Sequence, residues 1–347
     1  MATGVQRDLA TLTTGLRRWL AARPELVPGA RSGPAGFDIA ELTRAEGGMS
    51  SETLLVDLGP DHDGIVVRLP PVSASLLDYD LTPQALVQNA VAASGVPAPA
   101  PAVVEGDLGW IGSPFMVMPR VAGRIPGPAP IFDRWLMALE PAGQRTIHDG
   151  LIDSLADVHA VDWRAHDLGA VFAPSALGDV IEHWADYVAW SSDDDPLPVL
   201  VQALAWCRAH QPADVGGAGA VLLWGDVRLG NLIYGDDLAV AAVLDWDLAS
   251  VGPPEMDLGW YFGLEFMMDR LFEDRVPGFP TRAEALQRYG ARSGHTVDHL
   301  DFHEVFALVR ALAISDRHQR IAGSRRRVDN PMGPVLLARM EAADRSA

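Results

Sequence analysis

Four polar side chains near the middle of the chain have the types and the spacing that phosphoryl transfer requires. Asp226 and Asn231 stand in WGDVRLGNLIY, and Asp245 and Asp257 follow in VLDWDLASVGPPEMDLGW. A carboxylate such as Asp226 can accept the proton of a substrate hydroxyl, and it needs little base strength because the transition state is loose. An amide oxygen from Asn231 and a carboxylate from Asp245 can ligate Mg²⁺, whose other ligands are then phosphate oxygens and water. The stretch therefore predicts a phosphoryl-transfer centre.

Short strands must position these residues. The apolar runs on either side of Tyr234-Gly235-Asp236-Asp237 predict a β-hairpin. Asn231 comes before its first strand and Asp245 after its second, so both side chains collect at the open end. A hairpin whose ends carry polar residues by chance is the simpler alternative, and the ordered set of four residues argues against it.

Two carboxylates in this stretch, Asp257 and the additional Asp247, have supporting roles. Asp257 follows Gly252-Pro253-Pro254 and opens a predicted helix. We expect it to cap that helix or to bond the backbone of the loop that carries Asp226. Asp247 is either a second metal contact or a brace of its own loop.

The charge of the chain limits its partners. It has 27 basic and 46 acidic residues, a net charge of −19, and every basic residue is an arginine. Nucleic acid and anionic membranes reward positive surface, so neither is an expected partner. The acidity suits a cationic substrate or simply a solvated surface. A mechanism that needs a lysine is excluded unless another residue replaces it.

The chain carries no feature of a secreted or membrane protein. No apolar run reaches the roughly 18 residues of a membrane span, and no secretory signal is visible at the N-terminus. The single cysteine, Cys207, has no disulfide partner within the chain. We therefore expect a cytoplasmic protein.

The first third of the chain predicts a helix, a linker and then strands. Apolar spacing indicates a helix over about residues 6–22, and residues 24–36 are rich in Pro, Gly and Ala. From residue 37 the pattern turns to β-strands, with a helix near 83–91 and an extended strand at VPAPAPAVV. Arg68 lies inside an apolar strand and must find a partner or an anion.

Beyond about residue 122 helices dominate, at residues 131–165, 197–210, 258–272, 282–293 and 302–320. His295, His299 and His303 would line one face of a continuous helix as metal ligands. Gly294 and the run 298–301 indicate a loop and a cap instead, so we expect no zinc site. Hydrolase-elbow, zinc-ribbon and P-loop motifs are absent from the sequence.

At this point the chain resembles a known family. The catalytic and metal-binding segments of the aminoglycoside phosphotransferase family are similar to WGDVRLGNLIY and VLDWDLASVGPPEMDLGW. Within that family, the chain is most similar to the branch that includes the kinase domains of acyl-CoA-dehydrogenase-10-like proteins. The resemblance extends over about residues 40–320 through the supporting stretches GGMSSETLLVDL, IVVRLPP, VPAPAPAVV, PFMVMPRVAGR, LADVHAVDW and PGFPTRAEALQRYGARSG.

The resemblance implies an α+β, two-lobed protein-kinase-like fold. Residues 1–36 would be an N-terminal helix and linker. Residues 37–121 would be a small antiparallel β-sheet lobe with one helix that covers the nucleotide. Residues 122–347 would be a larger, mainly helical lobe that carries the catalytic hairpin.

Residue roles follow from the same resemblance. Asp226 would be the catalytic aspartate, and Asn231 and Asp245 would hold Mg²⁺, with Arg228, Asp247 and Asp257 in support. The residues that would contact ATP are Gly47, Gly48 and Ser50 of a phosphate-covering loop, Arg68 and Gln84, and the hinge residues Met118, Arg120 and Val121. Glu265 and Asp269 are candidate substrate contacts.

The chain departs from the family at three of these positions. Arg68 stands where an ATP-anchoring lysine is usual, and Gln84 stands where its partner glutamate is expected. A hydrogen bond between Gln84 and Arg68 would replace the ion pair. Trp224 replaces the usual histidine before Gly-Asp.

Two functions follow as alternatives. The first is an ATP-dependent phosphotransferase acting on a hydroxylated small molecule (an amino sugar, a hydroxyacyl thioester or another alcohol). The second is a catalytically weak, nucleotide- or ligand-binding pseudokinase.

Overall fold

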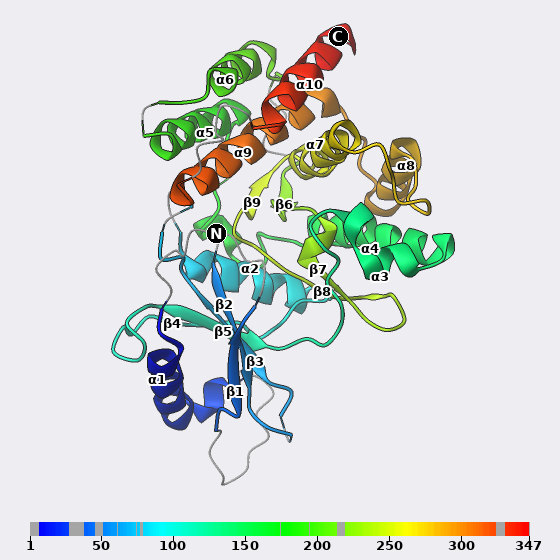
Figure 1. The fold of residues 1–347 in the computed structure, drawn as a ribbon. Helices are drawn as coiled ribbons and strands as arrows, with labels where there is room; N and C mark the ends of the chain where they lie inside the picture. The colour runs from blue at the N-terminus through cyan, green and yellow to red at the C-terminus, as the bar shows by residue number, and fades with distance from the viewer. Residues whose placement is uncertain are drawn as a thin grey trace. The chain divides into compact units, whose positions relative to one another are not determined.

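A computed structural model describes residues 7–27, 38–45, 51–60, 62–73, 75–76, 79–173, 175–193, 195–213, 219–323 and 330–346. Contacts within the chain divide it into two compact units, Met1–Ala122 and Gly123–Ala347. Each unit has its own buried core, and Figure 1 shows the helices and strands of both.

The first unit is built on a five-stranded antiparallel sheet with the strand order β1-β2-β3-β5-β4. Its elements are α1 (Leu9–Ala22), a 3₁₀ turn (Pro24–Leu26), β1 (Glu41–Arg44), β2 (Glu52–Asp57), β3 (Ile65–Leu69), α2 (Leu81–Ala93), β4 (Val103–Glu105) and β5 (Phe115–Pro119). The predicted N-terminal helix and antiparallel sheet are confirmed.

The two helices cover opposite faces of this sheet, as alternate residues of β5 show. Phe115 and Val117 belong to the core beneath α1, where Trp19 meets Phe115 edge-on at 5.4 Å between ring centroids. Met116 and Met118 point the other way and pack with the buried face of α2. Because side chains alternate across a strand, a central strand covered on both faces must be apolar throughout. This explains the continuous run FMVM.

The prediction of one long strand at VPAPAPAVV was wrong. Only Val103–Glu105 pairs with β5. Pro97, Pro99 and Pro101 have no N–H to donate to a sheet, so residues 96–102 form no strand.

The second unit is mainly helical and contains two small antiparallel sheets. Its helices are α3 (Arg134–Ala138), α4 (Pro141–His159), α5 (Leu177–Ser191), α6 (Pro198–His210), α7 (Glu255–Leu271), α8 (Arg282–Ser293), α9 (Leu300–Ile321) and α10 (Met332–Ser346), with 3₁₀ turns at Pro130–Phe132, Leu168–Ala170 and Leu229–Asn231. Its strands are β6 (Val221–Leu223), β7 (Leu232–Tyr234), β8 (Val240–Val243) and β9 (Ser250–Gly252).

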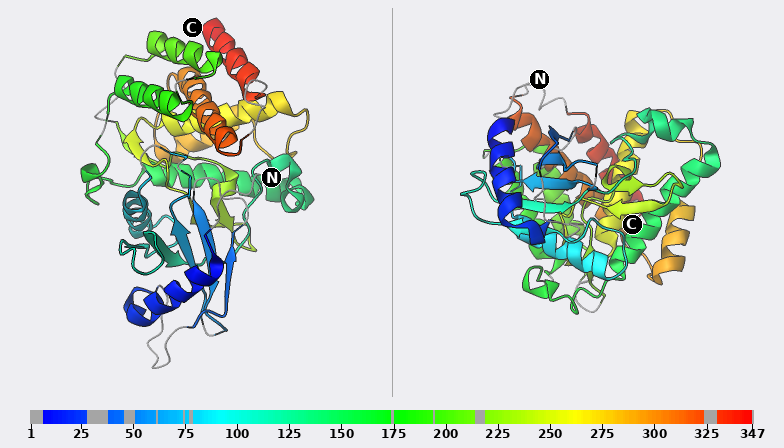
Figure 2. Two further views of the ribbon diagram at one scale, coloured as in Figure 1. Left: turned by 60° about the vertical axis from the view of Figure 1, so that its left-hand side comes forward. Right: turned by 90° about the horizontal axis from the view of Figure 1, so that it is seen from below.

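The predicted hairpin is present as β7 and β8, with Leu232 opposite Val243. The strand before it, β6, pairs with β9 instead, with Leu223 opposite Ser250. These two small sheets lie close to α4 and α7 in the ribbon (Figures 1 and 2). The loops that carry Asp226 and Asp245 each run from one sheet to the other, so both sheets fix their ends.

Some helices differ from the sequence expectation. The predicted helix over 131–165 is broken into α3 and α4, because Pro141 begins a new helix after an extended Leu139. Helices α5 and α10 were not predicted. None of the helices in the described part of the chain has both the length and the apolar character needed to span a bilayer.

The core of the second unit depends on close packing between α7 and α9. Residues 255–263 of α7 and residues 302–310 of α9 are buried without interruption. At Gly259 the backbones approach so closely that a Cβ atom would lie 2.6 Å from the carbonyl carbon of His303. Glycine is therefore required there by contact rather than by backbone angle.

We expect Gly259→Ala to lower the free energy of unfolding by about 1–3 kcal/mol, because the added methyl group forces α7 away from α9. Urea unfolding followed by tryptophan fluorescence measures the change. Gly290→Ala in α8 is the matched control, since its Cβ would meet only the His295 carbonyl oxygen, at 3.4 Å. The control should be neutral or slightly stabilising, by up to about 1 kcal/mol. Equal effects of the two substitutions would contradict this account.

Candidate active site

A tight loop leads from β6 to Asp226. Gly225 has φ +91°, and a Cβ atom there would lie 2.2 Å from the carbonyl oxygen of Leu248. Only glycine satisfies both the backbone angle and the contact. Trp224 precedes it with no exposed surface and donates its indole N–H to the Leu244 carbonyl oxygen at 2.7 Å. The indole of Trp224 is thus accommodated by packing and by a hydrogen bond.

The carboxylate of Asp257 holds this loop through two backbone hydrogen bonds. Its Oδ2 accepts the backbone N–H of Trp224 at 2.7 Å, and its Oδ1 accepts that of Gly225 at 2.9 Å. His159 Nε2 lies 3.1 Å from Oδ2, and His159 Nδ1 lies 2.7 Å from the Tyr289 hydroxyl. The expectation that Asp257 bonds the backbone of the Asp226 loop is confirmed.

The carboxylate of Asp226 is fixed by three donors. Arg228 Nε and Asn231 Nδ2 each donate to Oδ2 at 2.7 Å. On the other side, Trp260 Nε1 donates to Oδ1 at 3.0 Å. The side chain keeps 17% of its surface exposed. Since a carboxylate oxygen can accept two hydrogen bonds, Oδ1 retains capacity for a substrate hydroxyl.

Arg228 is the basic partner of this centre. Burial alone would lower its pKa, but the charge and hydrogen bond of Asp226, and then the charge of Asp245, hold the pKa of Arg228 above its ordinary value. Arg228 therefore stays cationic and offsets two neighbouring carboxylates. Its role as a supporting residue remains a prediction.

Asn231 and Asp245 lie at the same end of the hairpin. The N–H of Leu244 donates to the backbone carbonyl of Asn231 at 2.9 Å, which puts Asp245 one residue beyond that bond. Both hydrogen bonds from the Asn231 side chain use its nitrogen, to the Asp226 carbonyl and carboxylate. The amide oxygen is the atom left to act as a ligand.

The donor set suits Mg²⁺. One amide oxygen and one carboxylate are oxygen ligands, and phosphates and water can complete an octahedron around the ion. Asp245 has φ +65°, a conformation that is rare outside glycine and costs about 1 kcal/mol or more, and such residues cluster at functional sites. In the described residues, no group of three or more His, Cys, Asp or Glu side chains is arranged to hold a metal.

The histidine series at 295–303 forms no such site either. Helix α8 ends at Ser293, Gly294 has φ +73°, and His299 has φ +52° directly before α9. The interrupted helix that the sequence indicated is confirmed. His303 is buried, which lowers its pKa to about 3 and keeps it neutral.

The predicted nucleotide residues of the first unit are partly described. Gly47, Gly48 and Ser50 lie outside the described residues. Arg68 is buried in β3 and donates to the Ser51 hydroxyl from Nε at 3.2 Å and from Nη2 at 3.0 Å. Ser51 directly follows the predicted phosphate-covering loop.

The predicted hydrogen bond between Gln84 and Arg68 is not formed, so that prediction was wrong. Gln84 lies in the first turn of α2 and donates to the Asp80 carbonyl at 3.2 Å. Its amide oxygen is buried and has no hydrogen-bond partner in the part of the chain that the structure describes. The helix start competes for this side chain, because its first carbonyl groups are within reach of a glutamine one turn later.

The predicted hinge residues have different surroundings. Met118 is still within β5, opposite Val66 of β3. The Arg120 N–H donates to the Gly64 carbonyl at 3.2 Å, and its side chain lines a hollow beside the turn between β2 and β3. Val121 lies beyond Pro119, the last residue of β5. The role of each as a base contact remains a prediction.

The two candidate substrate residues lie one turn apart on α7. Asp269 forms an ion pair with Arg275. Burial, and secondarily the charge of Asp269, raises the pKa of Glu265 to about 7, with Arg275 opposing. This pair therefore carries less negative charge near neutral pH than its sequence indicates.

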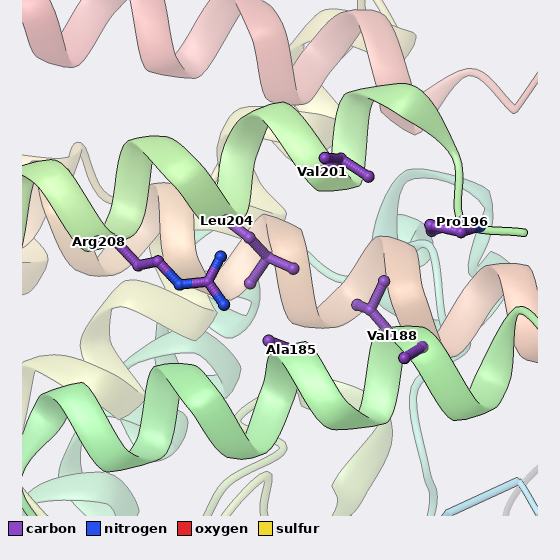
Figure 3. Close-up of a pocket in the computed structure, with 7 residues that line it drawn as sticks. Ala185, Val188, Pro196, Val201, Leu204 and Arg208 are labelled. Carbon is purple, nitrogen blue, oxygen red and sulfur yellow. The ribbon is translucent and has the colours of Figure 1, made fainter. Parts of the chain in front are cut away.

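A separate hollow lies between α5 and α6, lined by apolar residues such as Val188 and Leu204 and closed at one end by Arg208 (Figure 3). None of the predicted site residues lines it. Arg208 is engaged there by Glu182, with both bonds at 2.7 Å.

Trp260 is the contact of Asp226 that sequence reasoning missed. It lies on α7, three residues after Asp257, and the sequence offered only its place in the motif MDLGW. A buried indole N–H needs a hydrogen-bond acceptor, so the tryptophan indicates such a contact once a neighbouring carboxylate is known.

The fold is kinase-like: a five-stranded antiparallel N-terminal sheet is followed by a mainly helical C-terminal part that carries small sheets. Residues 41–305 match the phosphotransferase enzyme family, and the chain belongs to that family. The resemblance drawn from the sequence is therefore confirmed.

Particular relatives show how far this similarity extends. Acyl-CoA dehydrogenase family member 10 of Mus musculus is 29% identical over 290 residues, 79% of this chain and 26% of that protein. A putative aminoglycoside phosphotransferase from Ralstonia eutropha matches with a TM-score of 0.71 at 24% identity, over 95% of this chain and 98% of the other. An aminoglycoside phosphotransferase in complex with ADP and hygromycin B has a TM-score of 0.56 at 17% identity, over 89% and 95%. The chain spans about a third or less of the length of the curated relatives that it matches.

The raised pKa of Glu265 predicts a pH dependence of stability. The folded chain keeps this proton to about pH 7, whereas an unfolded glutamate loses it near 4.5. The folded state binds more protons in that window, so this group's contribution to stability falls as pH rises through it. Glu265→Gln should remove that loss. The unfolding free energy of the variant minus that of wild type should therefore be about 1–3 kcal/mol higher near pH 8 than near pH 5. Urea unfolding at both pH values measures it. A difference independent of pH would contradict the assignment.

Proposed function

We propose that this chain transfers the γ-phosphate of ATP to a hydroxyl group of a small molecule, with Asp226 as the catalytic carboxylate. The observation that carries this proposal is the geometry of Asp226: three donors fix its carboxylate, and Oδ1 retains room for one more hydrogen bond. Family membership supports a phosphotransferase, and the ADP bound to one structural relative is consistent with ATP as donor.

Asp226 orients the acceptor. Its Oδ1 accepts the hydroxyl proton as the bond between the acceptor oxygen and the γ-phosphorus forms. The bond from phosphorus to the β,γ-bridging oxygen breaks at the same time, and its electron pair leaves with ADP. Positioning supplies most of the catalysis here, because a loose transition state needs little help from a strong base.

The metal would be held by Asn231 and Asp245. When bound, Mg²⁺ neutralises charge on the β- and γ-phosphate oxygens. Asn231 also links the two functions, because its nitrogen donates to Asp226 while its oxygen is left for the ion. Arg228 keeps the carboxylates from repelling each other.

The remaining assignments follow from this function. We assign residues 37–121 to the nucleotide-covering lobe and residues 122–347 to the catalytic lobe. Gly47, Gly48, Ser50, Arg68 and Gln84 are the candidate ATP contacts of the first of these. Residues 1–36 would be the preceding helix and linker. A cytoplasmic setting fits the single cysteine, Cys207, which is buried and has its pKa raised to about 12.

One observation favours the second candidate, a nucleotide-binding pseudokinase. Arg68 replaces the expected lysine, and Gln84 turns to Asp80 instead of supporting it. Thermal-shift titration with Mg-ATP alongside turnover separates the two candidates. Stabilisation without phosphate transfer to any acceptor would favour the pseudokinase.

We expect Asp226→Ala to lower phosphate transfer by about 100- to 10,000-fold, because the acceptor hydroxyl loses its proton acceptor. Transfer is measured from γ-labelled ATP to a panel of hydroxylated acceptors. Stabilisation by Mg-ADP reports that the variant is folded. Asp236→Ala, an exposed residue in the hairpin turn, is the matched control and should retain full activity. Full activity in the Asp226 variant would overturn the assignment.

Asp245→Asn should raise the Mg²⁺ concentration that gives half-maximal stabilisation by ADP, by about 10- to 100-fold, since a charged ligand becomes neutral. Asparagine tolerates the left-handed backbone at this position, so the loop should keep its shape. The readout is the shift in melting temperature with ADP at increasing Mg²⁺, which needs no turnover. An unchanged Mg²⁺ dependence would move the metal away from Asp245.

A further inference from the structure

Arg310 is a buried arginine that forms no ion pair with any residue in the described part of the chain. It lies on α9 with 5% of its surface exposed. Its Nε is fully enclosed without a hydrogen-bond partner, and within the described residues its guanidinium forms no ion pair or hydrogen bond. An unpaired buried charge costs several kcal/mol, so such a group calls for an explanation.

Aromatic rings enclose this guanidinium. Its Cζ lies 4.8 Å from the ring of Trp260, 5.6 Å from Trp184 and 5.6 Å from Phe306. Cation–π contacts stabilise a guanidinium by about 1–2 kcal/mol. They leave its in-plane N–H donors unused, because those donors point along the edge of the group.

Another buried arginine shows that the chain does pair such charges elsewhere. Arg339, 3% exposed, donates to Glu304 at 2.7 Å and also bonds Asp301. Arg310 contacts aromatic rings where Arg339 donates to carboxylates, and the charges of Asp257 and Asp226 act on it without a direct hydrogen bond.

Arg310 lies one ring away from the catalytic carboxylate. Trp260 stacks against Arg310 and donates its indole N–H to Asp226 Oδ1 at 3.0 Å. Burial lowers the pKa of Arg310 to about 10, and the carboxylates of Asp257 and Asp226 oppose that change. It therefore remains cationic at neutral pH.

The side of Asp226 on which Arg310 lies identifies the ligand. Arg228 and Asn231 contact Oδ2, toward the proposed metal ligands. Trp260 and then Arg310 lie on the Oδ1 side, where the acceptor hydroxyl would bind. An anion here would belong to the acceptor rather than to the nucleotide.

We propose that Arg310 binds an anionic group, a carboxylate or a phosphate ester, of a small hydroxylated acceptor. The identity of the ligand as the acceptor rests on the proposed function; the binding of an anion at Arg310 does not. The planar fork of arginine can donate two parallel hydrogen bonds to either group. The overall negative charge of the chain opposes the binding of an anionic acceptor, and only an acceptor that reaches Arg310 gains a contact that compensates for this repulsion. The charge would then favour selectivity over affinity.

Binding without nucleotide tests the proposal. The probes are short hydroxy acids paired with their primary amides, and glycerol phosphate paired with glycerol, measured by calorimetry. Wild type should bind at least one charged probe about 10- to 100-fold more tightly than its neutral partner. The pair that shows the difference distinguishes a carboxylate from a phosphate ester.

Arg310→Met should abolish that preference while leaving stabilisation by Mg-ADP unchanged. Methionine fills the aromatic cage and removes the charge. Arg317→Met is the matched control, because Arg317 lies on the same helix with its Cζ 4.3 Å from the Trp190 ring. The control should retain the preference for the charged probe.

Equal affinity of wild type for the charged and neutral members of both pairs would overturn the proposal, even if Arg310→Met does not fold. An unchanged preference in a folded Arg310→Met variant would overturn it too. If charged probes bind through Arg310 but no phosphate is transferred to them, the anion site stands and the proposed function fails.

Discussion

The structure of the candidate site depends on one buried carboxylate, that of Asp257. It is 1% exposed and accepts the backbone N–H groups of Trp224 and Gly225 together with a contact from His159. A buried carboxylate without such partners would cost several kcal/mol, so the loop and the carboxylate stabilise each other. Through this group α4, α7 and α8 all hold the turn that presents Asp226.

This arrangement separates the residues that hold the loop from Asp226, the residue proposed to act on the acceptor. Asp257 and His159 are sealed in the interior, whereas Asp226 keeps part of its surface exposed. Each oxygen of Asp226 faces a different neighbour, Oδ2 toward Arg228 and Asn231 and Oδ1 toward Trp260. A carboxylate fixed on both sides loses little freedom on binding an acceptor, which is how positioning lowers a barrier.

Local pattern was enough to predict the hairpin and the strands of the first unit, because glycine turns and alternating apolar residues act over short distances. The antiparallel sheet followed from the resemblance of the segments around Asp226 and Asp245 to a phosphotransferase family. Contacts between distant residues were not predictable. The bond from Trp260 to Asp226 joins residues 34 apart, and β6 pairs with β9 across the whole hairpin. The failed pairing of Gln84 with Arg68 has a different cause, because a local contact prevailed: the Asp80 carbonyl at the start of α2 accepts the amide N–H.

The fate of the γ-phosphate tests the central claim, direct transfer at Asp226, most directly. Wild-type protein is incubated with γ-labelled ATP, Mg²⁺ and hydroxylated acceptors, and the label is followed on small molecules and on protein. The account predicts label on the hydroxyl oxygen of an acceptor and none bound covalently to the protein. Label retained on the protein, or no labelled acceptor under conditions where Mg-ATP binds, would contradict it.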